Sequence, residues 1–148
     1  MATIRGFLLP EELHYQVDKH IWARPQVDGT VRLGLTPVAY ALLNNTLVAV
    51  SVRPQLVGQL VARGKSLVMV ESLKYIGPLA APFAGVLVGV NERLATDPDL
   101  ALSDPYGAGW IAEMVPADWD AAQADLLTGP PAIEAYSRLL EHEKISWV

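Results

Sequence analysis

Short runs of residues typical of β-strands recur along most of the chain, and in one of them apolar and polar positions alternate strictly. Residues 30–35, Thr-Val-Arg-Leu-Gly-Leu, alternate cleanly after the turn-forming pair Asp28-Gly29. Alternation with a period of two residues is typical of β-strands that bury one face. Other short runs of apolar and β-branched residues predict further strands at residues 15–18, 21–24, 46–52, 66–71, 84–90 and 110–115. We therefore expect a β core that extends over about residues 14–116.

The period of the apolar positions changes after this β core. Two sets of apolar residues are spaced as on helical faces, and residues 128–131, Thr-Gly-Pro-Pro, separate them. The first set is Trp119, Ala122 and Leu126, and the second is Ile133, Tyr136, Leu139 and Leu140. A further short helix is expected at residues 38–43, where Thr36-Pro37 supplies an N-cap and a first helical position. The predicted fold is mainly β, in one domain over residues 1–148, with two short C-terminal helices at about 117–143.

Composition excludes several classes of site. The net charge is −5 and the basic residues are scattered, so no basic surface for nucleic acid is expected. The chain has no cysteine, which excludes disulfides, thiolate metal sites and redox chemistry by protein sulfur. The three histidines, His14, His20 and His142, lack the spacing of metal ligands, so no metal site is expected.

No membrane segment is expected either. The long uncharged runs at residues 33–52 and 75–91 are interrupted by Pro37, by Asn44-Asn45 and by Gly77-Pro78. A membrane-spanning helix needs about 20 predominantly apolar residues, so we interpret these runs as buried strands and turns. The N-terminal stretch lacks the long apolar region of a signal peptide, and we expect a cytoplasmic protein.

Lys74 stands alone among apolar and small residues. The next charged residue after it is Glu92. Lys74 follows the predicted strand at 66–71, and Gly77-Pro78 indicates a turn, so the lysine is expected at or near the tip of a hairpin. A rigid tip with a long side chain suits the attachment of a prosthetic group. On composition alone, however, a solubilising lysine is the favoured interpretation, because most lysines are exposed and have no special role.

A set of ordered motifs changes that interpretation. The two most specific are Glu71-Ser72-x-Lys74 and Asp104-Pro105-Tyr106-Gly107-x-Gly109-Trp110. The others are His20-x-Trp22, Asp28-Gly29-Thr30-Val31, Gly34-x-Thr36, Ala81-Pro82-x-x-Gly85 and Val90-Asn91-Glu92-x-Leu94. With these motifs in this order, the chain resembles the glycine-cleavage H-protein family of lipoyl carriers from about His14 to Leu140.

The resemblance implies a barrel-sandwich hybrid, the fold of lipoyl domains, and a carrier without catalytic activity of its own. It implies that lipoate is joined to Lys74 as an amide and that Glu71 is recognised by the lipoate ligase or by the lipoyl or octanoyl transferase. His20, Ile21, Tyr75 and Ile76 are candidate contacts of the lipoyl arm. A protein without cysteine would also have no thiol to form mixed disulfides with the dithiolane.

Two positions depart from the glycine-cleavage pattern. The family usually reads His-Glu-Trp where this chain has His20-Ile21-Trp22, and a second carboxylate stands where this chain has Pro78. Those carboxylates are thought to hold the aminomethyl group, because an ammonium needs an acceptor when it leaves water. Their replacement by Ile21 and Pro78 predicts a cleft that favours a neutral or sulfur-bearing arm.

One branch of H-like proteins matches this change. Lipoate-binding proteins of bacterial sulfur oxidation resemble the chain in Tyr75-Ile76-Gly77-Pro78 and in Met1-Ala2-Thr3-Ile4-Arg5-Gly6. This resemblance implies carriage of a sulfur-bound intermediate, with a heterodisulfide-reductase-like complex, a lipoate ligase and a dihydrolipoyl dehydrogenase as partners.

Two alternatives remain open. The first is a glycine-cleavage carrier that moves an aminomethyl group between glycine decarboxylase and aminomethyltransferase. The second is an unmodified H-like binding module. A biotin carrier is disfavoured, because Leu73 and Tyr75 flank the lysine where biotin carriers typically have methionines.

Overall fold

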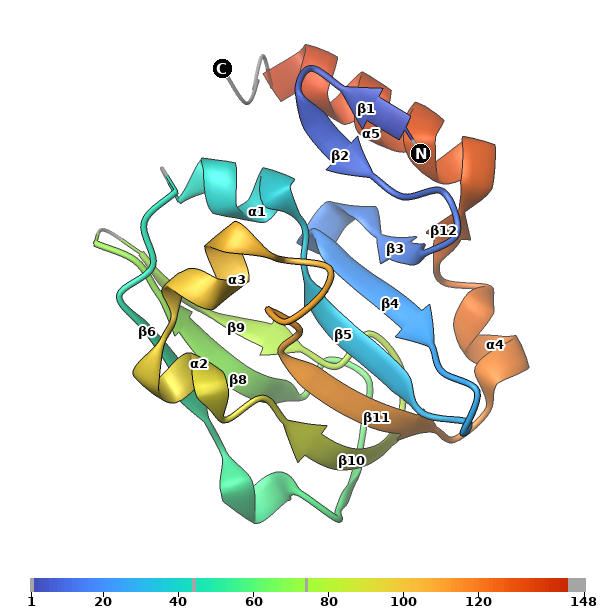
Figure 1. The fold of residues 1–148 in the computed structure, drawn as a ribbon. Coiled ribbons are helices and arrows are strands. Elements are labelled where there is room, and N and C mark those ends of the chain that lie inside the picture. The colour runs from blue at the N-terminus through green and yellow to red at the C-terminus, as the bar shows by residue number, and fades with distance from the viewer. Residues whose placement is uncertain (1, 44, 74, 144–148) are drawn as a thin grey trace.

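The fold is a β-sandwich of two main antiparallel sheets with helices at its ends (Figure 1). It is taken from a computed structural model that describes residues 2–43, 45–73 and 75–143. The larger sheet has the strand order β12-β3-β4-β5-β11-β10-β7. In that order, its strands are Leu127–Thr128, His14–Gln16, Ile21–Pro25, Val31–Leu35, Ala112–Pro116, Gly85–Val90 and Leu60–Val61. This sheet does not close on itself, so the fold is a sandwich rather than a closed barrel.

The smaller sheet has the order β6-β8-β9 and contains the hairpin that precedes and follows Lys74 in sequence. Its strands are β6 (Ala49–Val52), β8 (Ser66–Glu71) and β9 (Ile76–Ala80). Apolar side chains of both sheets meet in one buried cluster, which includes Leu33, Val68 and Leu87. Burying a side chain of this size contributes about 1.5–3 kcal/mol, so the seam between the sheets is the main source of stability.

Helices occupy the ends of the sandwich and the connections between strands. They are α1 (Pro37–Leu42), α2 (Arg93–Thr96), α3 (Asp99–Ser103), α4 (Trp119–Gln123) and α5 (Gly129–Glu143), with single 3-10 turns at Val17–Lys19 and Pro54–Leu56. The mainly β prediction with two C-terminal helices is confirmed by α4 and α5, although α5, at 15 residues, is not short. The Asp118 carboxylate caps α4 by accepting from the Ala121 N–H at 3.2 Å.

The N-terminal residues form a hairpin that the strand pattern did not predict. Strands β1 (Ala2–Ile4) and β2 (Phe7–Leu9) pair across a two-residue turn, in which Arg5 and Gly6 both have positive φ. Two positive φ angles suit the type I′ turn that matches the twist of a hairpin. Each strand has only three residues, too few to show a period.

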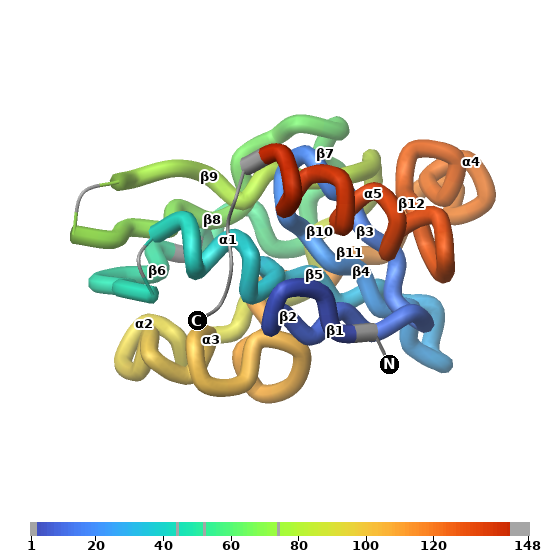
Figure 2. Tube along the Cα trace, turned by 90° about the horizontal axis from the view of Figure 1, so that it is seen from above, coloured from blue at the N-terminus to red at the C-terminus, as the bar shows by residue number. Residues whose placement is uncertain are grey.

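This hairpin and α5 share a second buried cluster, separate from the seam between the sheets (Figures 1 and 2). Phe7 and Leu9 of β2 pack there with Tyr136 and Leu140 of α5, and all four are fully buried. Strand β12 also lies beyond the predicted end of the β core and pairs with β3. The β structure therefore begins before residue 14 and continues past residue 116.

One predicted turn is wrong. Gly77 and Pro78 lie inside strand β9, where they pair with Val70 and Met69 of β8. Proline has no N–H to donate, and it is tolerated here because β9 is the edge strand of its sheet. The hairpin turns earlier, between the end of β8 and the start of β9.

The described residues contain neither a helix able to span a membrane nor a cluster of metal-ligating side chains. No helix among residues 2–43, 45–73 and 75–143 has both the length and the apolar character needed to cross a membrane. In the same ranges, no three or more histidine, aspartate or glutamate side chains are grouped as metal ligands would be.

Candidate functional site

The β8–β9 hairpin extends from the body of the protein beside β6 and α1 (Figure 2). Its tip is closed by the Ser72 N–H, which donates to the Tyr75 carbonyl at 2.7 Å. Glu71, at the end of β8, is exposed, and its carbonyl accepts from the Val48 N–H at 2.7 Å. The predicted attachment residue, Lys74, falls between Ser72 and Tyr75 in sequence and lies outside the described residues.

The chain segment across from the hairpin runs from Lys19 to α1. His20 follows the 3-10 turn with a positive φ of 57°, and its N–H donates to the Val17 carbonyl at 3.2 Å. The His20 carbonyl accepts from the Thr36 N–H at 2.9 Å, which ties the start of β4 to the start of α1. Pro37 begins α1 as predicted, but the Thr36 side chain makes no capping hydrogen bond.

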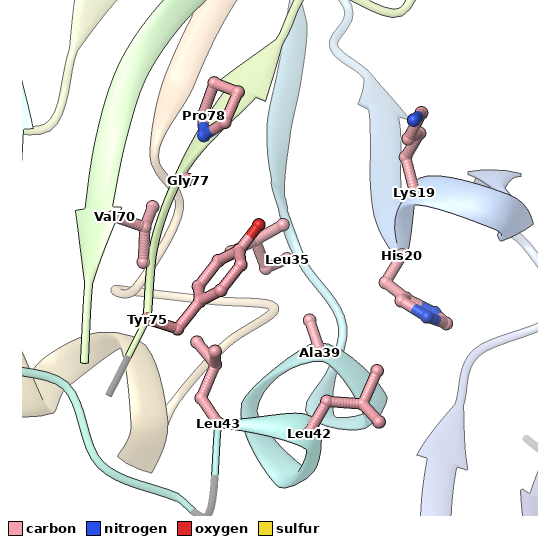
Figure 3. Close-up of a pocket in the computed structure, with 10 residues that line it drawn as sticks. All are labelled: Lys19, His20, Leu35, Ala39, Leu42, Leu43, Val70, Tyr75, Gly77 and Pro78. Atoms are coloured by element: carbon pink, nitrogen blue, oxygen red, sulfur yellow. The ribbon is translucent and has the colours of Figure 1, made fainter. Parts of the chain in front are cut away.

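A cavity of about 350 Å³ lies between these two parts of the structure (Figure 3). The hairpin forms one side, β5 and α1 form the floor, and the segment before β4 forms the opposite side. We call this cavity the arm pocket. Its lining residues are Lys19, His20, Leu35, Ala39, Leu42, Leu43, Val70, Tyr75, Gly77 and Pro78.

Tyr75 extends from the hairpin into the arm pocket. Its hydroxyl is turned toward Leu35, while the ring lies against Gly77 (Figure 3). A Cβ atom at Gly77 would overlap the Tyr75 hydroxyl and would come within 2.7 Å of the ring carbon Cε2. Glycine at this position is therefore what allows the Tyr75 ring to lie flat along strand β9.

The structure separates the four candidate arm contacts into two pairs. His20 and Tyr75 line the arm pocket from opposite sides. Ile21 is 2% exposed, belongs to the core between the sheets and is absent from the pocket lining. Ile76 is 60% exposed and is also absent from the lining. Arm contact remains a prediction for His20 and Tyr75.

The motifs did not identify most of the arm pocket. Lys19, Leu35, Ala39, Leu42, Leu43, Val70 and Gly77 line it but were not candidate residues. One signal was available: Ala39, Leu42 and Leu43 have the i, i+3, i+4 spacing of a single helical face. The sequence offers no comparable signal for Lys19 or Leu35, because their approach depends on how strands β4 and β5 meet the hairpin.

The charges around the arm pocket are positive or absent. Among its described lining residues there is one ammonium group, on Lys19, one imidazole, on His20, and no carboxylate. The Tyr136 ring lies 6.0 Å from the His20 ring, and burial raises the pKa of Tyr136, so that its phenol stays neutral. The remaining wall is apolar. The pocket therefore suits an apolar group with a neutral or negative end better than an ammonium.

The hairpin tip also presents exposed apolar side chains. Leu73, Tyr75 and Ile76 are 75%, 55% and 60% exposed, and Val48 and Leu42 nearby are about half exposed. Exposed apolar groups that gather at one place commonly mark a surface that contacts another protein. The tip therefore combines an adjoining pocket with a surface suited to protein contact.

Comparison with known proteins agrees with this arrangement. The sequence profile described as "Glycine cleavage H-protein" matches residues 13–142. Glycine cleavage system H protein 5 of Aquifex aeolicus is 38% identical, with 98% of each chain covered. Glycine cleavage system H protein 2 of the same organism is 34% identical and covers 96% of this chain and 86% of its own length.

A solved structure shares the fold. The crystal structure of a glycine cleavage system H protein from Mycobacterium marinum superposes with a TM-score of 0.70 at 33% identity, and the match covers 86% of this chain and 98% of that one. The profile match, the relatives and the shared fold agree along nearly the whole chain, and the chain therefore belongs to the glycine cleavage H-protein family.

Proposed function

We propose that the protein is a lipoyl carrier, with lipoate amide-linked to Lys74, and that the arm pocket receives the lipoyl arm between reactions. The observation that carries this proposal is the position of the pocket, whose lining includes Val70, Tyr75, Gly77 and Pro78 from the hairpin that brackets Lys74. An arm attached at the tip would need only to fold back along β9. Lipoate would supply the redox-active dithiol that a cysteine-free chain lacks.

The chemistry of the pocket fits the group. The dithiolane and its alkyl chain are apolar, and the lining is largely apolar, with Leu35, Leu42 and Leu43 on the side of β5 and α1. Small-molecule sites commonly combine such walls with a few polar groups that fix orientation. Here the polar groups would be the Tyr75 hydroxyl, the His20 imidazole and the Lys19 ammonium.

For the cargo, the family comparison favours glycine cleavage. The relatives reported above are named as glycine cleavage system H proteins. In this function the arm would carry an aminomethyl group from glycine decarboxylase to aminomethyltransferase, and a dihydrolipoyl dehydrogenase would reoxidise the arm. The exposed apolar side chains at the tip, Leu73 and Ile76, would contact these enzymes and the lipoate ligase or transferase.

One observation favours a second candidate, carriage of a sulfur-bound intermediate. No described lining residue is a carboxylate, and Lys19 and His20 line the pocket on the side opposite the hairpin. An aminomethyl ammonium moved into this pocket would lose hydration without gaining a counter-charge. A neutral or anionic sulfur group would not, and Lys19 would attract an anion. The partner would then be a heterodisulfide-reductase-like complex, which no relative reported above names.

The carrier role is tested by intact mass. The protein is isolated from cells supplied with lipoate and a lipoate ligase, beside Lys74→Ala and the control Lys65→Ala, which removes an exposed lysine directly before strand β8. We expect one lipoyl increment on the wild type and on Lys65→Ala, and none on Lys74→Ala. An unmodified wild type under conditions that lipoylate a known H protein would favour the unmodified binding module.

The cargo is tested by exchange of the glycine carboxyl carbon with bicarbonate, catalysed by glycine decarboxylase on the lipoylated protein. Efficient exchange would support glycine cleavage and refute the sulfur candidate. Failure to exchange, in an assay where a known H protein succeeds, would support the sulfur candidate.

A variant tests the charge argument directly. Pro78→Asp adds a carboxylate at an exposed lining position, so exchange should rise if the missing counter-charge limits it. Pro130→Asp, at the start of α5, adds the same charge away from the pocket and serves as the control. Glutamate at position 21 is unsuitable, because the Ile21 side chain is buried in the core and a carboxylate there would be desolvated. Equal exchange by wild type and Pro78→Asp would contradict the charge argument.

A further inference from the structure

Ser72 is a buried polar residue in an exposed part of the molecule. It is 6% exposed, whereas Glu71 before it is exposed and Leu73 after it is 75% exposed. A buried hydroxyl is expected to be hydrogen-bonded, because leaving it without a partner costs free energy on folding. The bonding partner of Ser72 therefore indicates what this residue does at the hairpin tip.

The partner is the Tyr75 carbonyl, on the other side of the tip. The Ser72 hydroxyl donates to this oxygen at 3.4 Å, and the Ser72 N–H donates to the same oxygen at 2.7 Å. The backbone bond is the shorter of the two, and the hydroxyl adds a second, weaker bond to it. In sequence, Leu73 and Lys74 separate Ser72 from Tyr75. Both donors of one residue therefore join the two sides of the tip that bracket Lys74.

The part of the hairpin below the tip is fixed by other contacts. The Glu71 carbonyl accepts from the Val48 N–H at 2.7 Å, and Glu71 and Ile76 form the last pair of the β8–β9 ladder. The Tyr75 ring lies against Gly77 (Figure 3). Among the described residues, the two bonds from Ser72 to Tyr75 are thus the last cross-strand bonds before the tip.

From this geometry we infer that Ser72 is a positioning residue for the modification of Lys74, an inference that rests on the proposed carrier function. The hydroxyl keeps the two sides of the tip together before the lipoate ligase binds. A tip that is already ordered spares the complex the entropy cost of ordering it, which is the usual benefit of preorganisation. The role assigned to Ser72 is therefore in recognition by the ligase.

Ser72 takes no part in the covalent step. The ligase forms lipoyl adenylate from lipoate and ATP, with release of pyrophosphate. The Lys74 amine then attacks the carboxyl carbon of the adenylate, the amide bond forms, the bond to AMP breaks and the nitrogen loses a proton. The Ser72 hydroxyl is buried and bonded to the Tyr75 carbonyl, so it does not reach these atoms. Its removal should raise the KM for the carrier protein and leave kcat unchanged.

The test is the steady-state rate at which a lipoate ligase modifies the full chain, with lipoate and ATP saturating and the carrier protein varied. Ser72→Ala should raise the KM for the carrier about three- to tenfold. Ser72→Thr keeps a hydroxyl and should restore most of the wild-type KM. Ser51→Ala removes an exposed serine from β6 of the same sheet and is the matched control, expected to behave as the wild type does.

Hydrogen exchange measures the order of the tip directly. The protection factor of the residue 72 amide should fall in Ser72→Ala and stay at the wild-type value in Ser51→Ala, because only the first variant loses a bond across the tip. All rates are measured at a temperature at which circular dichroism shows each variant to be folded, so that a change in KM reports the tip rather than unfolding.

The outcomes separate the role of Ser72 from the carrier role. An unchanged KM in Ser72→Ala, or a lower kcat with an unchanged KM, would overturn the inference while the carrier role stands. An equal rise of KM in Ser72→Ala and Ser51→Ala would overturn it as well, because the effect would not depend on the bond to Tyr75. A wild type that the ligase leaves unmodified would refute the carrier role and this inference with it.

Discussion

Replacing Gly34 with alanine tests the packing that holds strands β4 and β5 together behind the arm pocket. Gly34 lies directly opposite Trp22 in the β4–β5 register, and Trp22 is fully buried. A Cβ atom at Gly34 would lie 2.6 Å from three atoms of the indole ring, closer than the 3.0 Å that real Cβ contacts respect. The variant therefore forces either the ring or the strand to move.

The loss of stability expected for Gly34→Ala follows from the contacts that hold the Trp22 indole ring in place. Its Nε1 donates to the Pro105 carbonyl at 3.1 Å, and the Tyr106 ring centroid lies 5.8 Å from its own. Overpacking a well-packed core costs about 1–3 kcal/mol, and loss of the hydrogen bond adds about 1 kcal/mol. We expect the free energy of unfolding of Gly34→Ala to fall by about 2–4 kcal/mol, which for a chain of this size lowers Tm by roughly 4–16 °C.

The measurement is thermal and urea unfolding followed by far-ultraviolet circular dichroism. The matched control is Gly89→Ala in strand β10, where an added Cβ would meet no atom within 4 Å. Gly89→Ala should change the free energy of unfolding by less than about 1 kcal/mol. Alanine restricts the backbone of the unfolded chain more than glycine does, and this stabilising effect offsets any small loss of stability in the folded state. If Gly34→Ala unfolds at the wild-type temperature, the close packing of Trp22 on β5 is refuted.

Three further predictions concern single side chains. Gly77→Ala should push the partly exposed Tyr75 ring out of the arm pocket and lower the free energy of unfolding by less than about 1 kcal/mol. The movement is measured as a change in the chemical shifts of the Tyr75 ring in NMR spectra, and unchanged shifts would contradict the contact between Tyr75 and Gly77. Tyr40→Phe should unfold at or above the wild-type temperature, because it removes a buried hydroxyl that has no partner in the described part of the chain; a loss above about 2 kcal/mol would mean that the hydroxyl is bonded. Burial lowers the pKa of His14 below its ordinary 6.5, so the unfolded chain takes up this proton more readily and stability should decline as pH falls through 6.5. His14→Gln should flatten that part of the curve of Tm against pH, and an unchanged slope would rule out a contribution from His14.

Some features of the fold follow from local patterns. The short apolar run within residues 66–71 predicts strand β8 with the bounds that the structure has, and Leu67, Val68 and Val70 of this strand are buried in the core. Pro37 marks the start of α1 in the same local way. The strand β9 escaped this reasoning, since a Gly-Pro pair usually signals a turn, and only the position of β9 at a sheet edge makes proline acceptable there.

In the candidate site, too, some features follow from the local sequence and others depend on the tertiary structure. Motif spacing was sufficient to point to the hairpin and to Lys74, because those residues follow one another along the chain. The direction of a side chain was harder to predict. His20 and Ile21 are neighbours in sequence, yet His20 lines the arm pocket while Ile21 is buried in the core, because strand β4 begins between them and turns the two side chains to different sides.

The sequence by itself determined the family, the hairpin on which the proposed attachment lysine falls and the absence of protein thiols, since these depend on residue identity and on spacing along the chain. Only the tertiary structure decided the arm pocket and a second cavity on the other side of α1. The arm pocket joins residues 19–20, 35–43 and 70–78, and the second cavity joins residues 6–8, 37–40 and 102–106. Segments so far apart in sequence meet because burying the apolar faces of two sheets and of α5 brings them together, and no local pattern records that approach.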